Sequence, residues 1–270
     1  MKPTALSRFA FERDGLALAA YDSGGDGPAV VFQHGLCGDI GQVAEAFPEG
    51  TAFRLVGLEC RGHGASAAGD VLSIATFADD VAALIERIGG PVVLAGISMG
   101  AAIASRIAVR RPDLVRGLVL ARPAWVSEPE PANMRPNAEV GALLSHYAPE
   151  VARSRFVAGD AHAMLSREAP DNLASLLGFF ERQPADVTAR LLSAISADGP
   201  GVSEDDLSGL SVPTLVLATD RDFIHPLAHA ERLFRLVPAS RMVEMTPKGV
   251  DKAAYLSDFH TALGAFLREF

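Results

Sequence analysis

The sequence predicts an α/β fold in which a mostly parallel sheet is covered by helices on both faces. Short apolar runs with the character of buried strands alternate along the chain with amphipathic helical patterns. This alternation is typical of parallel sheets. The chain has 270 residues, of which 49% are hydrophobic and 21% are charged, so it can bury the large core that such a fold requires.

The expected elements follow one another along the chain. A hairpin is predicted at the N-terminus from residues 5–12 and 16–21, which flank an Arg-Asp-Gly turn. Short apolar runs predict buried strands at residues 29–32, 53–58, 92–95, 117–121, 213–218 and 241–245. Amphipathic patterns predict helices after Ser98 and at residues 226–237, 251–270 and 73–89, the last with a capping box made by Thr76 and Asp79.

Charge and composition exclude several classes of partner. The formal net charge is −9 and the isoelectric point is about 5.3, which argues against nucleic acid and offers no basic patch to an anionic membrane. The first residues contain no apolar signal-peptide region, and no apolar run approaches the roughly 20 residues of a membrane span. We therefore expect a soluble cytoplasmic protein. Its cysteines, Cys37 and Cys60, suggest neither a disulfide framework nor a metal site and are expected to be buried thiols.

One pentapeptide predicts a reactive serine. Gly96-Ile97-Ser98-Met99-Gly100 joins the strand at 92–95 directly to the following helix, with no residues left for a loop. Such a turn holds its serine in a strained conformation, and side chains in place of the two glycines would meet neighbouring backbone. The helix N-terminus also favours negative charge beside the serine oxygen. Ser98 is therefore the candidate nucleophile.

Two further motifs complete a recognisable pattern. His34-Gly35 follows the strand at 29–32, and Glu59-Cys60-Arg61-Gly62-His63-Gly64-Ala65-Ser66 follows the strand at 53–58. With these motifs the chain resembles the α/β-hydrolase family, although Glu59 stands where that family commonly has aspartate. The resemblance implies an eight-stranded, mostly parallel sheet flanked by helices, and an oxyanion hole made by the N–H groups of Leu36 and Met99. It assigns His34 a bracing role and implies no cofactor.

The segment 123–212 is far too long for a loop in a compact domain and contains several helical patterns. In the family, an insertion at this point is a helical cap, which implies a core domain of residues 1–122 and 213–270 and a cap of residues 123–212. Trp125 is then a candidate substrate-binding residue in the wall of the pocket. Arg122 ends the preceding strand, where it would either bind a substrate carboxylate or form an internal ion pair with Asp222 or Glu59.

The acid of a catalytic triad is expected after the strand at 213–218. The family usually has an aspartate there with a proline four residues further on, and Asp222 and Pro226 match this spacing. Asp222 is therefore the expected acid, and Asp220 is the second choice.

The family's catalytic histidine is missing. It normally lies between the last strand and the last helix, where this chain has Thr246-Pro247-Lys248-Gly249-Val250-Asp251. Val250, or Asp251 in a shifted alignment, occupies the histidine position. The candidates for a replacement base are His225, Lys248 and, with less support from their positions, His146, His162 and His260. A site without a triad is a further alternative.

These observations predict a serine-dependent hydrolase. Its reaction would be acyl transfer or hydrolysis of a small, mostly apolar ester, thioester or amide, with Ser98 as nucleophile and Asp222 as acid. The alternative is a non-hydrolytic protein of the same fold, either a lyase or cyclase or a ligand-binding protein. The sequence does not indicate an oligomeric state.

Overall fold

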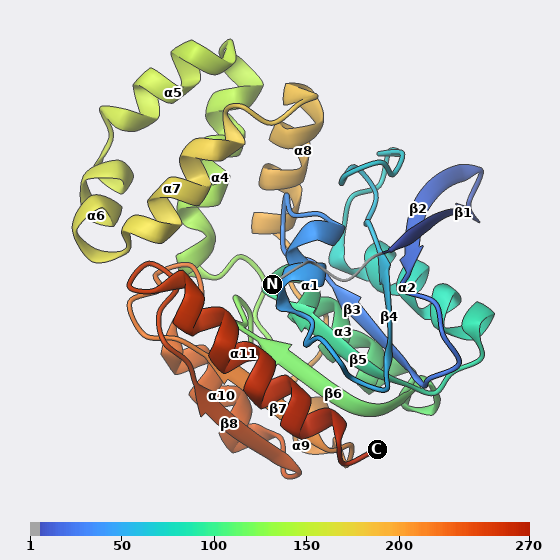
Figure 1. Ribbon diagram of the computed structural model, residues 1–270. Coiled ribbons are helices and arrows are strands. Elements are labelled where there is room, and N and C mark those ends of the chain that lie inside the picture. Colours follow the sequence, from blue (N-terminus) through green and yellow to red (C-terminus); the bar gives the residue numbers. More distant parts are fainter. Residues whose placement is uncertain (1–5) are drawn as a thin grey trace.

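The computed structural model describes residues 6–270 and contains an eight-stranded sheet with the strand order β1-β2-β4-β3-β5-β6-β7-β8 (Figure 1). Strands β1 (Ser7–Arg13) and β2 (Leu16–Asp22) form the predicted hairpin, and β2 also pairs antiparallel with β4. All other neighbouring strands are parallel. The predicted fold class is confirmed; residue 5 of the predicted hairpin lies outside the described residues.

The remaining strands begin and end close to the predicted positions. They are β3 (Ala29–Gln33), β4 (Arg54–Leu58), β5 (Val92–Ile97), β6 (Val115–Ala121), β7 (Thr214–Ala218) and β8 (Ser240–Glu244). The helices that pack on the sheet are α1 (Ile40–Ala46), α2 (Ile74–Ile88), α3 (Met99–Arg110), α10 (Leu227–Leu236) and α11 (Lys252–Leu267). Helix α1 was not predicted.

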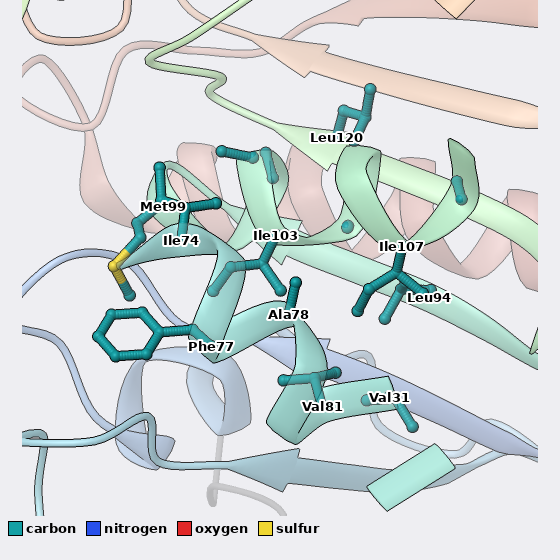
Figure 2. Close-up of a cluster of buried hydrophobic side chains, with 14 of the residues drawn as sticks. Val31, Ile74, Phe77, Ala78, Val81, Leu94, Met99, Ile103, Ile107 and Leu120 are labelled. Carbon is teal, nitrogen blue, oxygen red and sulfur yellow. The ribbon is translucent and has the colours of Figure 1, made fainter. Parts of the chain in front are cut away.

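Alternate side chains of each central strand enter two different cores. On one face, Leu94 of β5 joins a cluster with residues of α2, α3 and α10, including Phe77 and Ile103 (Figure 2). On the other face, Val93 of the same strand packs with residues of α1 and α11, including Phe259. All of these side chains are fully buried, and each contributes about 1.5–3 kcal/mol through the hydrophobic effect. The doubly covered sheet therefore holds the loops at its edges in fixed positions.

The N-cap of helix α2 lies three residues before the predicted capping box. The Ser73 hydroxyl accepts the N–H of Thr76 at 3.0 Å, and Ile74 is already the first helical residue. The predicted box of Thr76 and Asp79 is thus wrong, because Ser73 already satisfies the N–H of Thr76 and both predicted residues lie inside the helix. The helix ends at Gly89, whose φ of 83° gives the left-handed conformation of a C-cap.

Five helices between β6 and β7 form a group of their own at one end of the sheet (Figure 1). These are α4 (Arg135–His146), α5 (Pro149–Val157), α6 (Asp160–Glu168), α7 (Pro170–Phe179) and α8 (Ala185–Ser196). They share a buried cluster that includes Val140, Phe156 and Leu192, and Leu36 and Phe223 from the loops of the sheet pack against it. Short helices η2 (Ala132–Met134) and α9 (Glu204–Ser208) flank the group, and α9 packs against α3 and α10 instead. None of the helices within residues 6–270 has both the length and the apolar character needed to cross a membrane.

Candidate active site

Ser98 lies in a tight turn between β5 and α3, with a φ of 57° and a ψ of −113°. Its N–H donates to the carbonyl of Ala121 at 3.0 Å, which ties the turn to the neighbouring strand. A Cβ atom on Gly96 would lie 2.0 Å from the Gly100 carbonyl oxygen, and one on Gly100 would lie 2.3 Å from that of Gln33. Only glycine fits at either position, so the backbone itself holds Ser98 in its strained conformation.

The loop after β3 runs directly beside this serine. A Cβ on Gly35 would lie 3.3 Å from the Cβ of Ser98. The Gly35 N–H donates to Gln42 Oε1 at 2.7 Å, and the Cys37 N–H donates to His63 Nε2 at 3.0 Å. Between them, the Leu36 N–H has no partner within residues 6–270, and the same is true of the Met99 N–H at the start of α3. The two N–H groups expected to form the oxyanion hole are thus free of hydrogen bonds within the described residues.

Two buried histidines brace this loop. His34 accepts the N–H of Cys60 at Nε2 and donates from Nδ1 to the Gly35 carbonyl, at 3.1 and 2.8 Å. His63 accepts from Cys37 and donates from Nδ1 to the Arg61 carbonyl at 3.1 Å. Burial lowers the pKa of both imidazoles. Both rings are therefore neutral and fully engaged, which leaves no free nitrogen for proton transfer.

Asp222 follows β7 and is held by an unusually complete set of donors. Arg122 binds its Oδ2 through Nε at 2.8 Å and through a terminal nitrogen at 2.6 Å. Asn172 of α7 donates to Oδ1 at 2.9 Å, and the backbone N–H of His225 donates to the same oxygen at 3.0 Å. Burial alone would raise the pKa of Asp222, but His225 and Arg122 hold it well below its usual range. The carboxylate is therefore ionised near neutral pH.

His225 is the only base candidate in contact with Asp222 within residues 6–270. Its Nδ1 lies 2.9 Å from Oδ1 and 3.0 Å from Oδ2 of that carboxylate. The carboxylate requires Nδ1 to carry the proton, so Nε2 carries the free lone pair. Burial lowers the pKa of His225 and Arg122 lowers it further, while Asp222 opposes both effects. The imidazole is consequently neutral near pH 7.

The other candidate bases form no contact with Asp222 within residues 6–270. Lys248 is about one-third exposed and lies 3.8 Å from Asp171, with no contact to Asp222. Val250, at the family's histidine position, is 60% exposed and lines a second cavity of about 360 Å³. His260 binds the Glu45 carbonyl. His260, His146 and His162 do not line the cavity that contains Ser98.

The cavity around Ser98 has a volume of about 540 Å³, which suits a small-molecule ligand. His225, Arg122, Lys248 and Leu36 line it from the side of the sheet. Its remaining wall comes from the helices between β6 and β7 and mixes apolar with polar side chains: Met134, Asn137, Asn172, Leu176, Phe179 and Arg182. The sequence predicts a small, mostly apolar substrate, and this lining offers a ligand polar as well as apolar contacts.

Two residues predicted to bind substrate, Trp125 and Arg122, have structural partners instead. Trp125 is buried away from it and donates its indole N–H to the Asp198 carbonyl at 2.9 Å. Arg122 lines the cavity but forms the internal ion pair with Asp222, not with Glu59. Cys37 and Cys60 are both free, and burial raises the pKa of the Cys37 thiol to about 12. Cys37 also lines the cavity, but its protonated sulfur is a poor nucleophile.

The residues that sequence reasoning missed are Asn137, Asn172 and Arg182. All three belong to the helical segment, and their approach to Ser98 depends on how that segment folds back over the sheet. In residues 6–270 no group of three or more His, Cys, Asp or Glu side chains is arranged to hold a metal ion.

Comparison with known proteins identifies the family of the chain. The family model described as "Serine aminopeptidase, S33" matches residues 26–249. The chain is 28% identical over 228 residues to the pimeloyl-[acyl-carrier protein] methyl ester esterase of Aeromonas hydrophila, which covers 81% of this chain and 87% of that protein. It is 33% identical over 122 residues to the sn-1-specific diacylglycerol lipase of Mus musculus, which covers 44% of this chain and only 38% of the lipase.

Solved structures show the same fold at low sequence identity. An α/β hydrolase enzyme from a Medee basin deep-sea metagenome library superposes with a TM-score of 0.74 at 16% identity, over 95% of this chain and 97% of that one. The enol-lactonase from Burkholderia xenovorans LB400 gives a TM-score of 0.73 at 20% identity, over 96% and 99% of the two chains. Since the family model spans most of its length, the chain belongs to the serine aminopeptidase S33 family of α/β hydrolases.

Proposed function

We propose that the protein is a serine hydrolase that cleaves a small carboxylic ester, thioester or amide with a triad of Ser98, His225 and Asp222. The observation that carries this proposal is the contact of 2.9 Å between Asp222 and Nδ1 of His225, a residue that lines the cavity containing Ser98. In this proposal His225 supplies the imidazole that the family's missing histidine would otherwise provide. No direct hydrogen bond joins Ser98 and His225 within residues 6–270; catalytic hydrogen bonds are often long before substrate is bound.

In this mechanism each side chain has one role. His225 Nε2 removes the proton of the Ser98 hydroxyl as the oxygen attacks the substrate carbonyl, and Asp222 stabilises the imidazolium that forms. The N–H groups of Leu36 and Met99 donate to the carbonyl oxygen as it becomes negative, and the N-terminus of α3 adds its dipole. His225 then returns the proton to the leaving group. Water repeats the sequence on the acyl-enzyme with His225 as base, which restores Ser98.

The helical segment of residues 123–212 acts in this proposal as a cap on the core of residues 1–122 and 213–270. Its underside supplies one wall of the cavity, and Asn172 reaches across to the acid. A wall of this kind decides which substrates fit. Carboxylic esters are the first class to test, because esterases and a lipase are among the chain's relatives.

Labelling with a fluorophosphonate probe tests the nucleophile directly. The wild-type protein should react within minutes and hydrolyse short 4-nitrophenyl esters, whereas Ser98→Ala should do neither. Loss of an activated serine lowers turnover by about a millionfold. Circular dichroism and the melting temperature show whether the variant is folded. Slow or absent labelling of the wild-type protein would favour the non-hydrolytic alternative, a lyase or a ligand-binding protein.

A further inference from the structure

We propose that the part of the substrate that does not react carries a carboxylate, which is bound by Arg182 and Asn137. This inference rests on the proposed function, since it specifies the substrate of the same cavity. Three observations carry it: a buried amide without a partner, a guanidinium without a counter-ion, and the balance of charge in the lining.

Asn137 on α4 is 5% exposed, and its Oδ1 is fully buried without a hydrogen-bond partner within residues 6–270. Its Nδ2 also forms no hydrogen bond within residues 6–270. The residue lines the cavity that contains Ser98. An unsatisfied buried amide costs about 1–3 kcal/mol. Because Oδ1 only accepts hydrogen bonds, Nδ2 is the atom of Asn137 that can donate to a carboxylate in the cavity.

Two neighbouring asparagines show that the segment normally satisfies its amides. Asn133 donates to the carbonyls of Ala124 and Ile224, at 3.0 and 2.7 Å. Asn172 donates to Asp222 and accepts two backbone N–H groups. Asn137 is as deeply buried as these two residues but forms no side-chain hydrogen bond with any described residue. This contrast assigns it to ligand binding.

Arg182 supplies the positive charge. It follows α7, lines the cavity and forms no ion pair with any carboxylate among the described residues. Its terminal nitrogens donate to the Gly62 carbonyl at 2.7 Å and to Thr188 Oγ1 at 2.9 Å. These two contacts hold the guanidinium in place and use only part of its five N–H donors, so the remaining donors are available to a carboxylate.

The charge balance of the lining makes Arg182 distinctive. The whole chain has a net charge of −9, yet three of its cations line this one cavity. Arg122 and Lys248 are balanced by Asp222 and Asp171. Asp39 also lines the cavity, but it is an exposed residue whose carboxylate caps the N-terminus of α1. Arg182 is left as the cation that a substrate anion would neutralise.

Matched pairs of esters test the inference. The first pair places the carboxylate on the acyl side: mono-4-nitrophenyl glutarate against 4-nitrophenyl pentanoate. The second pair places it on the alcohol side: 4-acetoxybenzoate against 4-methylphenyl acetate. We expect kcat/KM of the wild-type enzyme to favour the anionic member of at least one pair by about tenfold, the contribution of a charge-assisted hydrogen-bonded pair. The preference should fall with added salt.

The variants identify the groups responsible. Arg182→Gln should reduce the ratio of anionic to neutral kcat/KM to about one, mainly through KM, while Arg182→Lys should keep part of it. Asn137→Ala should lower the ratio, and Asn137→Asp should lower it below one by placing a second carboxylate in the pocket. Arg190→Gln is the control, because Arg190 also donates to backbone carbonyls, those of Gly69 and Asp70, but does not line the cavity. It should leave the ratio unchanged.

The outcomes separate this inference from the proposed function. A wild-type enzyme that hydrolyses the neutral esters with no anionic preference in either pair would overturn the inference and leave the serine mechanism standing. Equal effects of Arg182→Gln and Arg190→Gln would also overturn it. If no ester is hydrolysed, calorimetric titration of wild-type protein and Arg182→Gln with monomethyl glutarate and methyl pentanoate decides the inference alone. Binding of the anion that is lost in the variant supports it, and absence of that binding refutes it.

Discussion

Asp222 and His225 lie three residues apart in one loop, and His225 binds the Asp222 carboxylate twice, through its ring Nδ1 at 2.9 Å and its backbone N–H at 3.0 Å. The orientation of the imidazole toward the acid is therefore set within a single turn of chain. The family's usual arrangement brings the histidine from the loop after β8, which here contains Val250. Four predictions follow from this local arrangement of acid and base.

Replacement of the two candidate bases should give opposite results. His225→Ala should lower kcat/KM on 4-nitrophenyl esters by several orders of magnitude, because no other imidazole lines the cavity within the described chain. Lys248→Ala should lower it less than tenfold, since Lys248 is paired with Asp171 instead of Asp222. Steady-state kinetics on both variants gives the ranking. The reverse ranking would transfer the role of base to Lys248.

The pH profile should report the titration of His225. Burial lowers its pKa from the usual value of about 6.5, Arg122 lowers it further, and Asp222 and Asp171 act in the opposite direction. The neutral, basic form then persists to lower pH, so kcat/KM should rise with pH through a midpoint below about 6.5 and stay level above it. Rates at saturating and at low substrate between pH 4.5 and 10 give this midpoint. A rise that continues toward pH 10 would indicate a lysine base instead.

Restoring the family histidine should not restore a triad. Asp222 already binds Arg122 at one oxygen and Asn172 and His225 at the other. Val250 is largely exposed and lines the second cavity, not the one that contains Ser98. We expect Val250→His to leave kcat/KM within about threefold of wild type, and His225→Ala with Val250→His to remain as inactive as His225→Ala. Recovery of activity in the double variant would show that the loop after β8 still reaches Asp222.

Removal of Arg122 should affect stability and the base together. Arg122→Met would leave the buried Asp222 without its cation, which typically costs about 3–5 kcal/mol of unfolding free energy. It should also raise the pKa of His225, because Arg122 lowers it, and so move the kcat/KM midpoint to higher pH.

Denaturant unfolding and the pH profile measure these two effects separately. The control is Arg232→Met, which removes an exposed ion pair with Glu204 and should cost at most about 1 kcal/mol. An equal loss of stability in the two variants would mean that the Arg122–Asp222 pair contributes no more than a surface contact.

Much of the fold could be predicted because local sequence patterns specify it. Short apolar runs, separated along the chain by helical patterns, predicted the strands of the sheet. The glycines around Ser98 predicted the tight turn that holds this serine. Helix α1 was missed because it is short and only Val43, Ala44 and Ala46 are buried, which is too few for an amphipathic stripe.

The candidate site was only partly predictable for a different reason. The register of Asp222 with Pro226 indicated the acid, but spacing alone could not choose between His225 and Lys248, since the choice depends on which side chain reaches the carboxylate. Asn137 and Arg182 carry no local signal at all. Their importance arises only where the helical segment meets the sheet, and tertiary packing fixes that contact.

The hydrogen bonds of Asn172 link the helical segment to the loop that contains Asp222 and His225. Its Nδ2 donates to Asp222, and its Oδ1 accepts the N–H groups of Phe223 at 2.8 Å and Ile224 at 3.1 Å. One side chain of α7 thus fastens the helical segment to both the acid and the backbone beside the base. Lifting α7 would break all three bonds at a cost of several kcal/mol, since one of the groups exposed is a buried charge. Substrate entry that leaves these three bonds intact would keep Asp222 and the backbone before His225 in place throughout turnover.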